Sequence, residues 1–323
     1  MYIVPREVHL DESGQNAIIA WNGNEEVIIL STDVKSSESA IVLRILTLPS
    51  NPTKVEEGSF DSFTKLIEII NKKVRAIRER EMYGVLGKVE APGVEITFHE
   101  KIGAHDITIV KVNDLDYFID WVKDFTVSKG FEYSEIPSEF KNTISSYLGR
   151  NLRYFVFDVI ETSETKQTVN PLVYRFKSDF LYYPLEITAF SDVGLSYAHV
   201  NIFLIAKGTV NKTIVANAGL WPRTGFDYTI ELNKKELEEV SPELGALFKS
   251  DPLVMNAYYY GSLNRLNRDL VVYEQDIHIP TFFDKISQSI SASLVFRYSS
   301  GMWDEITGYA PIWIKILLAI IWL

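Results

Sequence analysis

Hydrophobic and polar residues alternate with a period of two along much of this chain, which is the pattern of half-buried β-strands. The clearest stretch runs from Val94 to Phe125, where strand, turn, strand and helix signals follow one another without a break. Residues 94–98 and 107–112 both alternate in this way, and Gly103 lies between them. We therefore expect two paired strands joined by a turn at Gly103.

A helix is expected directly after these two strands, because apolar residues recur there at a spacing of three and four. The apolar stripe consists of Leu115, Phe118, Ile119, Val122 and Phe125. Asn113 or Asp114 is placed to cap the first turn of this helix. We expect the stripe to be buried and Trp121, which lies off the stripe, to be more tolerant of substitution.

The rest of the chain predicts further strands and helices on both sides of this stretch. An Asn22-Gly23 turn joins the first two strands, and Pro242 breaks the last helix. The other expected strands are residues 17–20, 26–30, 41–48, 153–160, 173–176, 185–190, 200–206, 213–218, 254–260 and 270–274. The other expected helices are one capped by Ser59, residues 138–148 and residues 234–249.

These elements predict an α+β fold with mixed or mainly antiparallel sheets and several packed helices. The composition becomes rich in β-branched and aromatic residues after about residue 150. We therefore divide the chain into an N-terminal α+β half (1–149), a β-rich second half (150–278) and a C-terminal helical segment with an apolar tail (279–323).

Composition and charge exclude several classes of function. The 323 residues include no cysteine, which excludes thiol catalysis, disulfides and thiolate metal sites. The net charge of −11 argues against a nucleic-acid partner, because phosphate backbones require a basic surface. The densest basic run, Lys72 to Arg80, is interpreted as the solvated face of a helix.

One segment carries residue types that bind metals, namely His99, Glu100, His105 and Asp106. Adjacent strand residues point to opposite faces, and five residues separate the two histidines rather than the three of a helical zinc motif. We therefore favour structural roles and expect no metal and no cofactor. A hydrolase with a site between His99 and Asp106 is the alternative function, and bound zinc lost on replacing both histidines would favour it.

Two other sets of polar residues are weaker candidates for catalysis. Ser31, His199 and Asp192 are the residue types of a hydrolase triad, but no nucleophile-elbow motif surrounds the serine. Asp179 and Glu186 flank an apolar run and are interpreted as two exposed strand ends rather than an acid–base pair. The chain contains no glycine-rich nucleotide-binding motif. The catalytic residues, if the chain has any, are therefore unknown.

Aromatic residues make up 13% of the chain. Tyr182-Tyr183, Tyr258 to Tyr260 and Trp221 fit a surface for a peptide or a glycan, although packing between sheets is the favoured interpretation. Asn211 begins an Asn-Lys-Thr glycosylation acceptor sequence, which has meaning if the chain is exported.

Six segments of the chain resemble, in this order, an uncharacterised bacterial and archaeal family catalogued as domain of unknown function 2330. They are residues 17–34, 45–60, 98–122, 154–159, 171–188 and 201–208. Residues 99–111, HEKIGAHDITIVK, suggest the archaeal branch of that family. The resemblance implies an exported, often membrane-attached protein and supplies no catalytic residues.

The two ends of the chain differ in character. The first ten residues lack the apolar segment of a signal peptide, so either the protein begins in the cytosol or this chain begins after processing. The 14 residues from Ala310 to Leu323 carry Lys315 as their only charge, and a helix of that length covers about 21 Å, short of the roughly 30 Å hydrocarbon core. We interpret the tail as a short membrane anchor, with a buried helix and an interfacial helix as alternatives.

Together these features predict a non-enzymatic, extracytoplasmic envelope or surface protein. Acidic Asp304 and Glu305 precede the tail, and this charge bias places the body of the protein outside the cytoplasm. The expected partners are a membrane, through the tail, and a protein or glycan.

Overall fold

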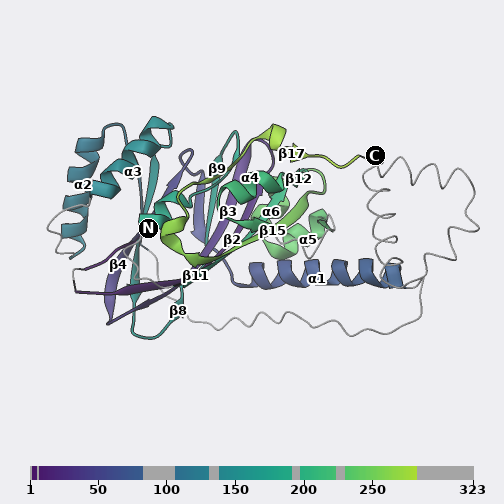
Figure 1. Cartoon of the computed structure of the whole chain (residues 1–323), viewed down its shortest axis with the longest axis horizontal. Coiled ribbons are helices and arrows are strands. Elements are labelled where there is room, and N and C mark those ends of the chain that lie inside the picture. Colours follow the sequence, from purple (N-terminus) through teal and green to yellow (C-terminus); the bar gives the residue numbers. More distant parts are fainter. Residues whose placement is uncertain are drawn as a thin grey trace, which may run out of the picture. The chain divides into compact units, whose positions relative to one another are not determined.

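The computed structural model describes residues 2–5, 7–82, 106–130, 138–190, 197–222 and 230–281 (Figure 1). The chain divides into two compact units, one of residues 1–73 and 92–279 and one of residues 74–91 and 280–323. Of the second unit, the described residues are 74–82, which end helix α1, and 280–281. All the sites below lie in the first unit.

A nine-stranded sheet is the largest element of the first unit. Its strands are β2 (Leu10–Trp21), β3 (Glu25–Ser36), β5 (Lys54–Glu57), β8 (Gln167–Thr168), β9 (Leu172–Lys177), β11 (Tyr197–Ala206), β13 (Trp221–Pro222), β14 (Ile230–Glu231) and β15 (Leu253–Ser262). Seven of them follow the order β13-β15-β11-β2-β3-β9-β5, while β14 pairs with β15 and β8 pairs with β3. The β11–β2 pair is parallel and the other described pairs of this sheet are antiparallel.

The hairpin of β2 and β3 confirms the predicted Asn22-Gly23 turn. Gly23 has a φ of 102°, a conformation that residues with a side chain rarely adopt. The backbone amide of Asn22 donates to the carbonyl of Glu25 at 3.1 Å, and the Asn22 side chain accepts from the amides of Asn24 and Glu25 at 2.9 Å. The turn fixes the register of the two strands and therefore the face on which each side chain lies.

A four-stranded antiparallel sheet lies beside the large one, in the order β1-β4-β7-β6. Its strands are β1 (Tyr2–Ile3), β4 (Ala40–Leu48), β6 (Asp106–Lys111) and β7 (Tyr154–Thr162). Two further pairs are β10 (Leu181–Tyr183) with β16 (Leu270–Val272), and β12 (Thr209–Val210) with β17 (Ile277–His278). Strands from residues 1–149 and from residues 150–278 share both large sheets, since β4 pairs with β7 and β3 pairs with β9.

Six α-helices are described, which with the sheets confirms the α+β class. They are α1 (Asp61–Met82), α2 (Leu115–Ser128), α3 (Ser138–Gly149), α4 (Lys212–Asn217), α5 (Lys234–Val240) and α6 (Pro242–Leu247). The 3₁₀ turns are η1 (Glu186–Phe190), η2 (Leu263–Arg265) and η3 (Glu274–Asp276). The predicted caps are present, because Ser59 accepts from the amide of Asp61 at 3.1 Å and Asp114 accepts from the amides of Asp116 and Tyr117. Pro242 separates α5 from α6, as predicted.

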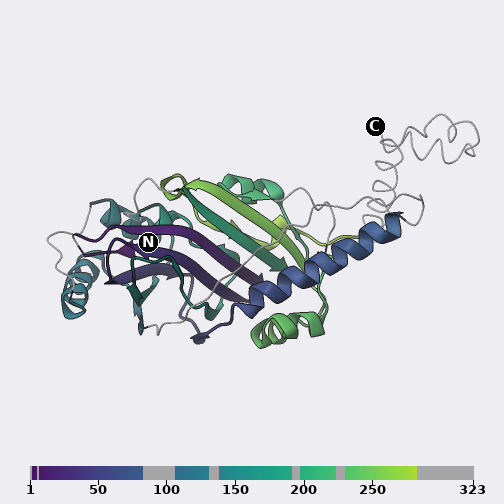
Figure 2. The ribbon, with the colours of Figure 1, turned by 90° about the horizontal axis from the view of Figure 1, so that it is seen from below.

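Among the described residues, two of the hydrophobic cores pack the sheets and helices that carry the sites below. The first lies on one face of the nine-stranded sheet, where residues such as Ile19 and Leu204 pack with Leu46 and Val156 of the smaller sheet. Helix α6 contacts the opposite face, where Asn22 Nδ2 donates to the carbonyl of Leu247 in α6 at 2.9 Å, and α5 packs against α6. Figure 2 shows α1 beside these two helices, and an ion pair of 2.8 Å joins Lys73 of α1 to Glu236 of α5.

The second core lies between the four-stranded sheet and the helices α2 and α3. Phe118 is buried there at 4% exposure, and Ile119 and Val122 are buried beside it, as the stripe predicts. Trp121 takes a larger part than expected from its place off the stripe. It is half-buried, with its ring 4.8 Å from that of Phe125 and 5.0 Å from that of Phe157 of β7.

Two predicted strands are wrong. Residues 185–190 form the 3₁₀ turn η1, because Pro184 cannot donate to a strand ladder and the Thr188 amide bonds to the Leu185 carbonyl at 3.0 Å. Residues 213–218 fall mostly in helix α4, which Asn211 caps by accepting from the amide of Thr213 at 2.9 Å. In both places local hydrogen bonds outweigh the β propensity of branched side chains.

Some expected elements lie outside the described residues, namely the strand at 94–98 and the apolar helix in the C-terminal segment 279–323. Among the helices in the described part of the chain, none combines the length and the apolar character that crossing a membrane requires.

Candidate functional site

An open part of the nine-stranded sheet carries five ring side chains on one face, here called the aromatic face. They are Tyr197 and His199 of β11, Trp221 of β13, and Tyr258 and Tyr260 of β15. Residues directly opposite each other in a sheet point to the same side. His199 pairs with Tyr260 and Trp221 pairs with Tyr258, so the sheet order β13-β15-β11 places all five on one side.

The side chains of the aromatic face are exposed to an unusual degree for their size. Tyr197 is 65% exposed, Trp221 51%, Tyr260 49% and Tyr258 37%. Tyr259, between the two exposed tyrosines of β15, points to the other side of the sheet and is 7% exposed. The ring centroids are 5.5 Å apart for Tyr197 and Tyr260 and 5.5 Å apart for Trp221 and Tyr258.

The same side of the sheet is closed further along the strands. Phe203 and Ile205 follow His199 and Asn201 on the same side of β11, and they are 5% and 0% exposed. Helix α6 contacts the sheet on this side, through β2 and β3. The aromatic face is therefore the uncovered portion of a surface that is otherwise packed within the described structure.

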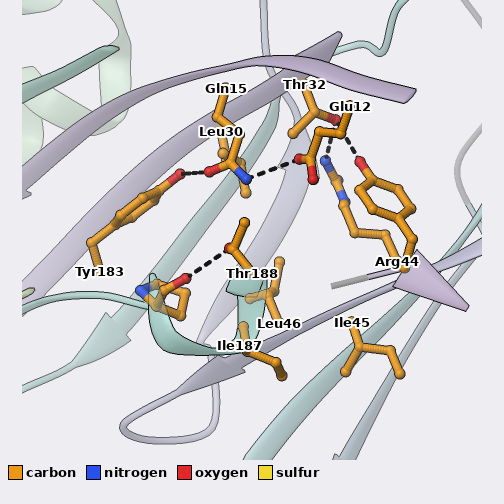
Figure 3. A pocket seen from close by; sticks show the side chains of 12 residues that line it. Glu12, Gln15, Leu30, Thr32, Arg44, Ile45, Leu46, Tyr183, Ile187 and Thr188 are labelled. Carbon is orange, nitrogen blue, oxygen red and sulfur yellow. Dashed lines mark hydrogen bonds between the residues drawn. The ribbon is translucent and has the colours of Figure 1, made fainter. Parts of the chain in front are cut away.

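A polar cluster on the opposite side of the sheet is the second candidate site (Figure 3). It is called the interior cluster and consists of Tyr2, Glu12, Gln15, Thr32, Arg44 and Asp158. A β-bulge between Glu12 and Gly14 shifts the register, so that Glu12 and Gln15 both point inward although three positions separate them. Gln15 Nε2 donates to Glu12 Oε1 at 2.9 Å, and the hydroxyl of Tyr183 donates to Gln15 Oε1 at 3.0 Å.

An ion pair completes the interior cluster. Arg44 donates to Asp158 at 2.6 Å and to the hydroxyl of Thr32 at 3.1 Å, and the hydroxyl of Tyr2 donates to Thr32 at 3.0 Å. Burial alone lowers the pKa of Arg44, but the neighbouring carboxylate of Asp158 outweighs it and raises the pKa. Burial raises the pKa of Glu12, and the hydrogen bond from Gln15 opposes this.

The cavity inside the interior cluster has a volume of about 20 Å³, which leaves room for about one water molecule. Glu12 Oε2 and Arg44 Nε have no hydrogen-bond partner among the described atoms, and both belong to side chains that line this space. A substrate does not fit a space of this size. The interior cluster is therefore a structural polar centre rather than a catalytic site.

A further buried network involves Glu186, one of the residues considered for acid–base chemistry. Glu186 pairs with Arg150 at 2.5 Å, and its backbone amide donates to Asp269. The hydroxyls of Tyr147 and Tyr182 both donate to Asp269 at 3.1 Å. Burial raises the pKa of Asp269, and the amide of Glu186 opposes the rise. This network joins α3, β10 and η1.

Asp179, the other residue of that candidate pair, is exposed, and the described contacts do not bring it to Glu186. The hydrolase triad is likewise not assembled. Ser31 is buried in β3 and donates to the carbonyl of Val169 at 2.9 Å, while His199 lies on β11 with β2 between them. Asp192 lies outside the described residues.

The candidate metal segment is described only at its last residue. His99, Glu100 and His105 lie outside the described residues, and exposed Asp106 pairs with Lys129. Within the part of the chain that the structure describes, no group of three His, Asp or Glu side chains is placed to hold a metal ion. The hydrolase alternative stays a prediction.

Two surface features follow their predicted interpretation where they are described. Lys72 and Arg75 of the basic run are exposed on α1. Asn211 of the glycosylation sequence is exposed, although its side chain also caps α4.

Sequence reasoning named Trp221 and Tyr258 to Tyr260 as a possible surface but favoured packing between sheets, which holds for Tyr259 and not for the other three. It did not add Tyr197 and His199. Tyr182 and Tyr183 are buried, so packing explains them as expected. Tyr197 and His199 could be found from the alternation of side chains along a strand. The segments YAHVN at 197–201 and NAYYYGS at 256–262 each place ring residues at every second position, and such residues lie on one side of a sheet.

Comparisons with known proteins show one family. The family described as "Uncharacterized protein conserved in bacteria", domain of unknown function 2330, matches residues 1–244. No curated protein matches the chain. The crystal structure of baculovirus P35 is similar with a TM-score of 0.41 and 12% identity, covering 83% of this chain and 97% of that one. The caspase-8/P35 complex is similar with a TM-score of 0.38, 12% identity and the same coverage.

Proposed function

This chain belongs to the family of uncharacterised proteins conserved in bacteria known as domain of unknown function 2330, and we propose that it is a non-enzymatic binding protein of the cell envelope. In this proposal the protein lies outside the cytoplasm and is attached to a membrane by a short hydrophobic helix in residues 310–323. The aromatic face binds another component of the envelope. Placement in an archaeal branch of the family, suggested by residues 99–111, stays a prediction.

The aromatic face is the observation that carries the proposal. Exposed single apolar residues are common, but a contiguous group of large rings on one surface marks a binding site. Trp and Tyr supply large, rigid contact areas at low entropic cost, and they dominate binding surfaces for this reason. The interior cluster, by contrast, offers no space for a substrate, which favours binding over catalysis at that place.

Membrane attachment rests on the sequence of the tail and is tested by cell fractionation. The chain is expressed with and without residues 309–323, and the membrane and soluble fractions are compared. We expect the longer chain in the membrane fraction, released by detergent, and the truncated chain in the soluble fraction. A longer chain that is wholly soluble without detergent would contradict the anchor.

The absence of cysteine allows a direct test of the expected location. Tyr117 of α2 is 81% exposed, so Tyr117→Cys introduces a single accessible thiol. Intact cells are treated with a maleimide that does not cross the membrane. We expect labelling of the variant and none of the parent chain. Labelling only after the cells are lysed would place the protein in the cytoplasm and overturn the proposal.

A further inference from the structure

The aromatic face is a strip of rings along one side of the sheet. Neighbouring strands lie about 4.8 Å apart, and alternate residues of one strand lie roughly 6.7 Å apart, so side chains on one side form a regular grid. Tyr260 occupies one grid position, with its ring 5.5 Å from Tyr197 and 4.4 Å from His199. Trp221 and Tyr258 extend the strip to the edge strand β13.

Two amide side chains continue the grid beside the rings. Asn201 lies opposite Tyr258, and Asn256 lies two residues before Tyr258 on β15. Asn256 Nδ2 donates to Asn201 Oδ1 at 2.8 Å and to the carbonyl of Ile202 at 3.1 Å. Among the hydrogen bonds of the described residues, none uses Asn201 Nδ2 or Asn256 Oδ1. The strip therefore offers a donor and an acceptor next to the rings.

The strip carries no formal charge. Residues 197–201, 221 and 256–262 include no Asp, Glu, Lys or Arg. The rings and amides of the strip itself are uncharged, and the net charge of −11 on the whole chain repels an anionic polymer. The chemistry of the surface therefore favours an uncharged ligand rich in hydrogen-bonding groups.

The exposed area of the aromatic face favours a small ligand over a protein partner. The four exposed aromatic side chains, between 37% and 65% exposed, present roughly 300–500 Å² if each ring residue buries about 150–250 Å² when fully covered. A stable protein interface buries about 800 Å² on each partner. The strip is too small for such an interface and large enough for a few linked rings of a polymer.

We infer that the aromatic face binds a neutral oligosaccharide. The C–H faces of the sugar rings stack on Tyr260, Tyr258 and Trp221, whose electron-rich faces attract these weakly positive hydrogens. The sugar hydroxyls bond to the free donor of Asn201 and the free acceptor of Asn256. This inference rests on the proposed function, since it names the class of component that the binding protein recognises.

The test measures binding of the purified full chain to neutral probes by tryptophan fluorescence and calorimetry. The probes are a β-1,4-glucan hexamer, a chitin hexamer, a soluble β-1,3-glucan and a mannan, with alginate and heparin as anionic controls. We expect saturable binding to at least one neutral probe and none to the anionic ones. Trp221→Ala and Tyr260→Ala should each lower the association constant at least about tenfold.

Two matched variants separate the surface from general effects. Asn201→Asp keeps the acceptor for Asn256 but removes the free donor and adds a charge, so it should weaken binding at least about fivefold. Tyr117→Ala removes an exposed ring on α2, away from the strip, and should change binding by less than about twofold.

The outcomes distinguish this inference from the proposed function. No binding to any neutral probe, or equal binding by the parent chain and both ring variants, overturns the oligosaccharide ligand. If, in that case, cross-linking in whole cells joins the parent chain to one envelope protein and Trp221→Ala abolishes it, the proposed function stands with a protein partner. If the ring variants behave as the parent in every assay, both fail.

Discussion

The interior cluster and the aromatic face occupy opposite sides of the same end of the nine-stranded sheet. Each departs from the usual distribution, in which apolar side chains are buried and polar ones are exposed. On one side polar and charged groups are buried, with Arg44 3% exposed and paired to Asp158 at 2.6 Å. On the other side large rings face outward, with Tyr197 65% exposed and in contact mainly with another ring.

The difference lies in what satisfies each group. Most polar atoms of the interior cluster bond to other atoms of the chain, and the space beside the two that do not has room for about one water molecule. Four rings of the aromatic face leave between 37% and 65% of their area exposed, which gives up part of the free energy that burial supplies. Groups that fold stability does not require at their positions are the better candidates for function.

The largest expected effect tests the packed side of this comparison. Phe118 is 4% exposed in the second core, so Phe118→Ala should lower the free energy of unfolding by about 3 to 5 kcal/mol. Trp121→Ala should cost less, because Trp121 is only half-buried in the same ring cluster. Chemical denaturation of both variants measures the difference. A Phe118 variant as stable as the parent would show that this helix face is assigned wrongly.

The next effect tests whether the interior cluster is structural. Asp158→Ala leaves the buried guanidinium of Arg44 without its carboxylate, and we expect a loss of about 3 to 5 kcal/mol in the free energy of unfolding. Replacing both residues, as in Arg44→Met with Asp158→Leu, should restore much of that loss, because two apolar side chains leave no unpaired charge. A double variant as unstable as Asp158→Ala would show that the pair has a further role.

Sequence reasoning located most of the elements that build these two sides. The Asn22-Gly23 hairpin, the Asp114 cap and the break at Pro242 are local signals, and the structure confirms each of them. Residues 185–190 and 213–218 were assigned to strands because branched side chains favour strands, whereas Pro184 and the Asn211 cap decide the local structure.

The site was harder to predict because it depends on contacts between distant segments. Tyr258, Tyr259 and Tyr260 are the same residue type, and only the alternation of side chains along the strand separates the buried one from the two exposed ones. The neighbours Tyr197 and Trp221 join them only through the strand order β13-β15-β11. The bulge between Glu12 and Gly14, which builds the interior cluster, likewise has no clear signal in the sequence.

A smaller effect on stability is expected from replacing Glu26, a charged residue type in an apolar part of the first core. Glu26 of β3 is 0% exposed; one carboxyl oxygen accepts from the amide of Tyr182 at 2.7 Å and the other has no partner among the described atoms. Burial raises the pKa of Glu26 well above its ordinary value, and the hydrogen bond from Tyr182 opposes this.

Because the folded state holds the Glu26 proton more tightly than the unfolded state, this group favours folding at low pH, and that contribution is lost as the pH rises through the folded pKa. Glu26→Gln keeps the acceptor for Tyr182 and cannot ionise. We expect a gain in stability of about 0.5 to 2 kcal/mol at neutral pH that grows as the pH rises. Chemical denaturation of the parent and the variant at several pH values measures this. A stability difference that does not change with pH would refute it.

The smallest expected change in stability is on the aromatic face, and adjacent residues of β15 provide the test. Tyr260 is 49% exposed and Tyr259 is 7% exposed, although the two are neighbours in sequence. Tyr260→Ala should change the free energy of unfolding by no more than about 1 kcal/mol, since it loses only ring contacts with Tyr197 and His199. Tyr259→Ala should cost about 3 kcal/mol or more, because it leaves a cavity in the first core and removes the 2.6 Å hydrogen bond to the carbonyl of Ser262. Chemical denaturation measures both losses. Equal losses for the two variants would mean that the rings of the aromatic face are held by packing, and the aromatic face would then no longer be a candidate binding surface.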